Sequence, residues 1–258
     1  CTGIFNTTLG AQAMQCNTGA CNTALGYCAL HNNSSARRNT AVGMKAGLSN
    51  TTGACNTIMG SEAFLLNTTG DKNVAIGQGS LYTTNGGAQN TALGTSSMFY
   101  NTTGCFNTAV GKSALLCNTT GGNNVGIGLC TLACVETGCC NIAIGECAGH
   151  GVACVDGTIA IGHCALFTGP GSGATIAIGT FALKSLTTGV GNMTMGACSM
   201  CTATTACNNI GYGIQSQKNL TTGRYNTSFG YNTLPGNREG CYNTAIGWHA
   251  LKANTTGT

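Results

Sequence analysis

A glycine recurs along this chain at an almost fixed interval, and this period limits the fold more than any other feature of the sequence. After a first step of 16 residues, every step from one glycine to the next is 17 residues. The repeat reads N-T-A-I-G-x-x-A-L-x-x-N-T-T-G-x-x, and its positions are numbered here from 1 to 17, beginning at the first Asn. Fifteen copies occupy the 258 residues. Such a repeat builds an array in which each copy contacts only its neighbours.

The repeat is too short and too rich in turn residues for helices. Known helical repeats are about 33 residues or longer, and Gly or Asn-Thr at every few positions breaks a helix. The sequence therefore predicts an all-β fold, a parallel β-solenoid (β-roll) of about fifteen 17-residue coils, as a single repeat domain over residues 1–258. No segment that resembles a cap is evident at either end, so we expect the chain to be part of a longer fibre or a polymer.

Positions 1 to 4 are typical of a short strand, and position 4 is apolar in every copy. Because side chains alternate along a strand, positions 2 and 4 share one face. We expect that face to point inward and the small residues at position 3 to form an outer wall. The predicted core stack comprises Leu25, Val42, Met59, Ile76, Leu93, Val110, Ile127, Ile144, Ile161, Ile178 and Ile246.

Two polar or backbone features also repeat with the coil. The glycine at position 5 indicates a corner with an unusual φ or a close backbone approach. These corner glycines are Gly26, Gly43, Gly60, Gly77, Gly94, Gly111, Gly128, Gly145, Gly162 and Gly179. The Asn at position 1 is either a turn residue or a member of a hydrogen-bonded ladder. The ladder residues are Asn22, Asn39, Asn56, Asn73, Asn90, Asn107, Asn124 and Asn141.

The 18 cysteines have a geometric meaning if coils stack. Residues at the same position of neighbouring coils have Cα atoms about 4.8 Å apart, which lies within the disulfide range. Cys117 and Cys134 share position 11, and Cys130, Cys147 and Cys164 share position 7 of three successive coils. These five residues are disulfide candidates, although Cys is also a small apolar filler. The spacing predicts no metal site and no cofactor.

Composition and charge argue against several functions. Charged residues are 6% of the chain, and no basic stripe with stacking aromatics indicates nucleic-acid binding. No run of 18 apolar residues predicts a membrane span. The six acidic residues and four histidines fall at scattered repeat positions, so no nucleophile, base and orienting group are brought together. We therefore expect a protein that is not an enzyme.

The repeat resembles two families of surface proteins. The run A-I-G-x-x-A, at residues 143–148 and 177–182, resembles the head repeats of YadA-like trimeric autotransporter adhesins. The longer unit with N-T-T-G is similar to repeats of viral and phage tail fibres. The resemblance covers nearly the whole chain and implies a left-handed β-roll, often a homotrimer, and an extracellular place on a virion or cell surface. It thus favours a structural fibre, filament or adhesin shaft that associates with itself.

Two other functions remain open. Regular Thr ranks on a flat solenoid would suit ice binding, but pairs such as Thr51-Thr52 are adjacent and face opposite ways. Surface glycans or a receptor could bind at variable positions, where Tyr27, Tyr231 and Trp248 lie. The sequons at Asn50, Asn67, Asn101 and Asn118 are either N-glycosylation acceptors or copies of a turn.

Overall fold

The computed structural model describes residues 3–169 and 173–257 and confirms the predicted parallel β-solenoid. Each copy of the repeat contributes one three-residue strand followed by turns, and no helix occurs in the described residues. No segment of that part of the chain thus forms a long apolar helix of the kind that spans a bilayer. The chain divides into two compact units, unit 1 (Cys1–Gly126) and unit 2 (Ile127–Thr258).

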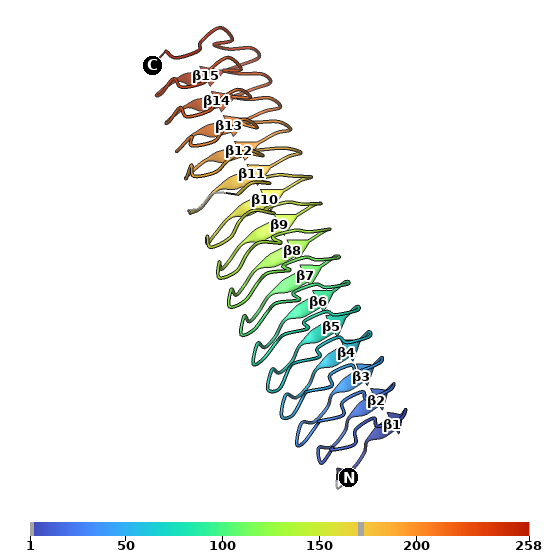
Figure 1. Ribbon diagram of the computed structural model, residues 1–258. Coiled ribbons are helices and arrows are strands. Elements are labelled where there is room, and N and C mark those ends of the chain that lie inside the picture. Colours follow the sequence, from blue (N-terminus) through green and yellow to red (C-terminus); the bar gives the residue numbers. More distant parts are fainter. Residues whose placement is uncertain (1–2, 170–172, 258) are drawn as a thin grey trace. The chain divides into compact units, whose positions relative to one another are not determined.

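Within each unit every strand pairs in parallel with the next one along the chain (Figure 1). The paired residues are 17 apart, except in the first pair of unit 1, where Thr7 lies beside Thr23. Unit 1 contains β1 (Thr7–Leu9), β2 (Thr23–Leu25), β3 (Thr40–Val42), β4 (Thr57–Met59), β5 (Val74–Ile76), β6 (Thr91–Leu93) and β7 (Thr108–Val110). Unit 2 contains β9 (Ile142–Ile144), β10 (Ile159–Ile161), β11 (Ile176–Ile178), β12 (Met193–Met195), β13 (Ile210–Tyr212), β14 (Thr227–Phe229) and β15 (Thr244–Ile246). The unit boundary falls within β8 (Val125–Ile127).

The strands face the opposite way from the one predicted. Position 3 is buried in every strand except β1, as at Ala41, Ala92 and Ala143, each of which has no exposed surface. Position 4 points outward, and every member of the predicted core stack is exposed or half-buried. Leu25, Met59, Leu93, Ile127, Ile144 and Ile246 are exposed, whereas Val42, Ile76, Val110, Ile161 and Ile178 are half-buried. The expected core stack is therefore an outer surface.

The narrow interior explains this orientation. Most coils have a buried small residue at position 8 and a buried large residue at position 9, such as Ala114 and Leu115. Little room remains opposite them, so position 3 is usually Ala. One coil shows the exchange directly: position 9 is Gly47, and the side chain of Ile58, at position 3 of the next coil, fills the space. A Cβ on Gly47 would lie 2.9 Å from Cδ1 of Ile58.

The corner glycines combine both properties that were expected of them. Gly94 has a φ of 139°, and a Cβ there would lie 2.6 Å from the carbonyl carbon and oxygen of Gly111 in the next coil. The same close approach joins Gly179 to Gly196. Any side chain would thus separate neighbouring coils.

Each coil also has left-handed backbone at positions 7, 9 and 17. Most residues at these positions have φ between 47° and 62°, although few of them are glycine. The N–H at position 7 donates to the preceding coil, as from Ser113 to Thr95 (3.0 Å), and that at position 9 donates to the next coil, as from Met98 to Ala114 (2.9 Å). No Val, Ile, Thr or Pro occupies these three positions in any copy. This agrees with the high cost of positive φ for β-branched residues.

A substitution at position 7 tests this rule. Ser113, at φ 55°, is half-buried. We expect Ser113→Gly to stabilise unit 1 by up to about 1 kcal/mol, because the left-handed conformation costs an L-residue roughly 1–2 kcal/mol while glycine loses more chain entropy on folding. Ser113→Val should destabilise it by about 1–3 kcal/mol. Thermal denaturation followed by circular dichroism checks both, and a stabilising Val would contradict the rule.

Candidate functional site

The asparagines at position 1 form a buried column. In unit 1 the N–H of Asn39 donates to Oδ1 of Asn22 (2.9 Å), and Nδ2 of Asn39 donates to the carbonyl of Gly53 in its own coil (2.8 Å). Asn56, Asn73, Asn90 and Asn107 repeat this pattern. In unit 2 Oδ1 of Asn141 accepts from the N–H of Thr158 (2.9 Å). Each side-chain amide of this pattern thus bonds the backbone of the neighbouring coil and the backbone of its own coil. The column therefore has a structural role.

A second asparagine column, at position 12, was not predicted. Nδ2 of Asn50 donates to Oδ1 of Asn33 (3.0 Å), and Nδ2 of Asn67 donates to Oδ1 of Asn50 (2.8 Å). Asn118 donates in the same way to Asn101 (2.8 Å). The four sequon asparagines lie in this column with no exposed surface. A glycan on any of them would not fit the folded coil, which favours their interpretation as turn copies.

The outer face of unit 2 is an apolar sheet surface. It is formed by positions 2 and 4 of β9 to β15 and is called the outer face below. Its members are Ile142, Ile144, Ile159, Ile161, Ile176, Ile178, Met193, Met195, Ile210, Tyr212, Thr227, Phe229, Thr244 and Ile246. None is charged, and eight of the large apolar members are between 37% and 72% exposed. Such a surface can bury area against another apolar surface.

A hollow of about 250 Å³ lies on this outer face, over β10 to β13. Its walls are the branched and sulfur-containing side chains at positions 2 and 4, and Gly211 lies at its base, where the strands β9 to β12 have Ala or Thr. The rings of Tyr212 and Phe229 stack at its edge, with centroids 4.5 Å apart. The hollow contains almost no polar group.

The corresponding face of unit 1 is chemically different. Position 2 there is Thr in six of the seven strands β1 to β7, with Val74 as the exception. Position 4 is Leu, Val, Met or Ile. Hydroxyl and methyl groups therefore share this face. The Thr hydroxyls at position 13 instead bond the backbone of the next coil. The hydroxyl of Thr51, for example, donates to the carbonyl of Thr68 (2.9 Å).

No disulfide occurs among the 17 described cysteines. The pairing of Cys117 with Cys134, and of two thiols among Cys130, Cys147 and Cys164, therefore stays a prediction. Stacking places Cys130, Cys147 and Cys164 on neighbouring coils of unit 2 as expected, but proximity does not by itself oxidise a thiol pair. The bond also needs an oxidant and a suitable dihedral angle.

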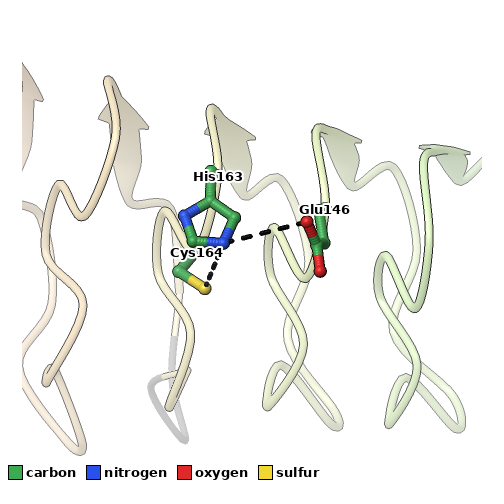
Figure 2. Close-up of polar contacts among 3 residues, drawn as sticks. All are labelled: Glu146, His163 and Cys164. Carbon is green, nitrogen blue, oxygen red and sulfur yellow. Dashed lines mark hydrogen bonds and ion pairs between the residues drawn. The ribbon is translucent and has the colours of Figure 1, made fainter.

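Three polar side chains meet beside this thiol column (Figure 2). Sγ of Cys164 lies 3.5 Å from Nε2 of His163, and the same Nε2 lies 3.9 Å from Oε2 of Glu146. A catalytic triad uses opposite ring nitrogens for the nucleophile and the acid, whereas both contacts here fall on one nitrogen. Among the described residues, moreover, no three or more His, Cys, Asp or Glu side chains are grouped so as to hold a metal ion.

The middle thiol of the column has a perturbed acidity. Partial burial raises the pKa of the Cys147 thiol, and the neighbouring Cys130, Cys164 and Glu146 raise it further because a second negative charge beside them is unfavourable.

This pKa shift predicts slow alkylation of Cys147. The thiolate is the reactive form, so a raised pKa leaves less of it at a given pH. We expect iodoacetamide to modify Cys147 more slowly than a free cysteine near pH 8, and the difference to shrink as the pH rises above the ordinary thiol pKa of about 8.5. Mass spectrometry of peptides after timed labelling measures this rate. Labelling of Cys147 as fast as free cysteine at pH 7 would contradict it.

The aromatic residues proposed for glycan binding are all exposed. Tyr27 lies in unit 1, and Tyr231 and Trp248 lie on adjacent coils of unit 2. The ring of Trp248 is 4.0 Å from that of His249, at an angle of 41°. Elsewhere in unit 2, Tyr225 and Tyr242 stack face to face at 5.1 Å, so each covers a face that a sugar ring would need.

Comparison with known proteins gives no family assignment: no family model, no curated protein and no solved structure matches the chain. Its function must therefore be argued from the surfaces described above.

Proposed function

We propose that this chain is a structural, self-associating β-solenoid, a segment of a fibre, filament or adhesin shaft on a virion or cell surface. The observation that carries the proposal is the uncharged, apolar outer face of unit 2. The resemblance of the repeat to adhesin heads and tail fibres supports the same interpretation. A second copy of the chain is the proposed occupant of the outer face, in a homotrimer or a lateral polymer.

The size of the outer face supports a stable contact. A large apolar residue has a full accessible surface of roughly 150–200 Å². The eight exposed members, at 37–72% exposure, then present roughly 600–750 Å². Monomeric proteins rarely expose a larger continuous patch, and a specific interface buries about 800 Å² on each partner. The half-buried isoleucines of β10 and β11 add to this area.

The chemistry of the outer face favours a like surface as its partner. A charged partner would leave its charges desolvated against Ile and Met, at a cost of several kcal/mol for each unpaired ion. Copies of an uncharged face bury no charge when they meet. In a homotrimer or a polymer each contact joins different parts of the outer face, and all of these parts are apolar. The hollow over β10 to β13 then receives apolar side chains from the other copy.

A pair of double variants tests self-association. Ile178→Lys/Met195→Lys places two charges on the outer face, while Thr188→Lys/Thr205→Lys places two charges at exposed positions 14 of the same two coils. We expect the native chain and the threonine control to form oligomers by sedimentation equilibrium at micromolar concentration. The outer-face variant should sediment as a folded monomer. A monomeric native chain, or equal association of both variants, would refute the proposal.

Unit 1 favours a second candidate function, ice binding. Its Thr row at position 2 and aliphatic row at position 4 repeat at the strand spacing of about 4.8 Å on a sheet of three-residue strands. Regularly spaced hydroxyl and methyl groups on a flat face suit an ordered water lattice. Thermal hysteresis of the native chain, abolished by Thr57→Lys and retained in the Ile178→Lys/Met195→Lys variant, would favour this function over the fibre.

A further inference from the structure

The column formed by Cys130, Cys147 and Cys164 carries an inference that does not depend on self-association. These thiols occupy position 7 of three successive coils, and their φ angles are 51°, 53° and 50°. The N–H of Cys147 donates to the carbonyl of Leu129 (2.8 Å), and that of Cys164 donates to the carbonyl of Glu146 (2.9 Å). The three nearly equal φ angles give the three side chains the same starting direction, and matching hydrogen bonds hold Cys147 and Cys164 in it.

The spacing of the column matches one kind of metal coordination. Neighbouring coils lie about 4.8 Å apart. A cation with two thiolate bonds of about 2.3 Å each, the length found for zinc, spans about 4.6 Å. Three sulfurs in a row cannot converge on one point, which agrees with the lack of any described cluster of three or more ligands. The geometry suits a cation that takes only two ligands in line.

We propose that this thiol column binds a soft, two-coordinate cation, Cu(I), between the sulfurs of two neighbouring coils. Thiolates are the ligands that Cu(I) prefers, and Cys147 belongs to both neighbouring pairs. Binding forms two Cu–S bonds and releases two thiol protons without a change of oxidation state. The released protons pass to the solvent that the half-buried thiols contact.

The surroundings agree with a binding site rather than a packed core. All three cysteines are half-buried, so the ion can reach them, and the column ends on the next coil at Phe181, whose ring contacts His163 at 5.1 Å. Position 7 of two other coils is Ser96 and Ser113, so serine variants should fold normally.

The test counts Cu(I) retained by the reduced, full-length chain under anaerobic conditions against a chromogenic Cu(I) chelator. Because the chain has 18 cysteines, single-thiol variants are compared. We expect Cys147→Ser to lose one equivalent, whereas Cys154→Ser, which removes an exposed thiol outside the column, loses none. Cys130→Ser should also retain the full number, because Cys147 and Cys164 remain.

A further variant separates the column from general thiol affinity. In Cys130→Ser/Cys164→Ser the central thiol is present but has no neighbour, so we expect the loss of the same equivalent as in Cys147→Ser. Melting temperatures within a few degrees of the native chain show that the coils are intact. Equal copper content in Cys147→Ser and Cys154→Ser, whether unchanged or reduced, would overturn the proposal.

Discussion

Gly179→Ala is expected to destabilise unit 2 by about 4 kcal/mol or more. Gly179 has a φ of 129°, and a Cβ there would lie 2.6 Å from the carbonyl carbon and oxygen of Gly196. Both contacts are with backbone, so no side chain can move aside. The coils must separate, and the hydrogen bonds between them lengthen. An effect of this size is exceptional for one methyl group and follows from strain and clash together.

Gly247→Ala is the matched control because it isolates the strain from the clash. Gly247 lies in the same column with a φ of 113°, but nothing lies within 4 Å of the position of its Cβ. We expect a loss of about 1–3 kcal/mol from backbone strain alone. Thermal denaturation ranks the two variants. Since repeat arrays need not unfold in one step, hydrogen exchange of the amides near Gly196 shows where the coils open. Equal effects of the two variants would contradict the close-approach argument.

The coil length and register were predictable because glycine records them. Glycine is needed at position 5 because neighbouring coils approach there too closely for a Cβ. The glycine therefore recurs every 17 residues, although the residues at most other positions differ between copies. The same register placed Cys130, Cys147 and Cys164 in one column. Their oxidation state was not predictable, because it depends on redox conditions that no residue pattern encodes.

The direction of the strands was not predictable from alternation alone. A three-residue strand shows that positions 2 and 4 share a face but not which face is buried, and hydrophobicity pointed to the wrong one. Side-chain volume held the answer: position 3 is Ala in most coils because the interior already contains the residue at position 9. The pair Gly47 and Ile58 shows this volume limit most clearly, because a large residue at position 3 occurs where position 9 is glycine.

Two further features of the fold cannot be found from the hydrophobic pattern. The absence of Val, Ile, Thr and Pro from positions 7, 9 and 17 marks the left-handed backbone. The second Asn column could not be separated from turn chemistry, because N-T-T-G suits both. Its burial becomes clear only when the coil closes around Asn50 and Asn67.

Asn90→Ala should destabilise unit 1 by about 2–4 kcal/mol, because the lost amide serves groups in two coils. Oδ1 of Asn90 accepts from the N–H of Asn107 (3.0 Å), and Nδ2 of Asn90 donates to the carbonyl of Gly104 (2.8 Å). The N–H of Asn107 is left buried without a hydrogen bond, at about 1–3 kcal/mol. The carbonyl of Gly104 keeps a hydrogen bond from Nδ2 of Asn101 (3.1 Å), so its lost bond costs only about 1 kcal/mol more. Asn85→Ala, at an exposed position of the preceding coil, is the control and should cost under about 1 kcal/mol.

Asn90→Thr distinguishes the amide from the space it fills. Thr occupies position 1 at Thr158, where its hydroxyl is buried and has no hydrogen-bond partner. A hydroxyl is also too short to bond in both directions, so Asn90→Thr should recover less than half of the stability lost in Asn90→Ala. Urea denaturation of the three variants measures the order. If Asn90→Thr restores native stability, neighbouring coils are held together by the volume of the side chain at position 1 and not by its hydrogen bonds. The hydrogen-bonded Asn column would then be a consequence of packing.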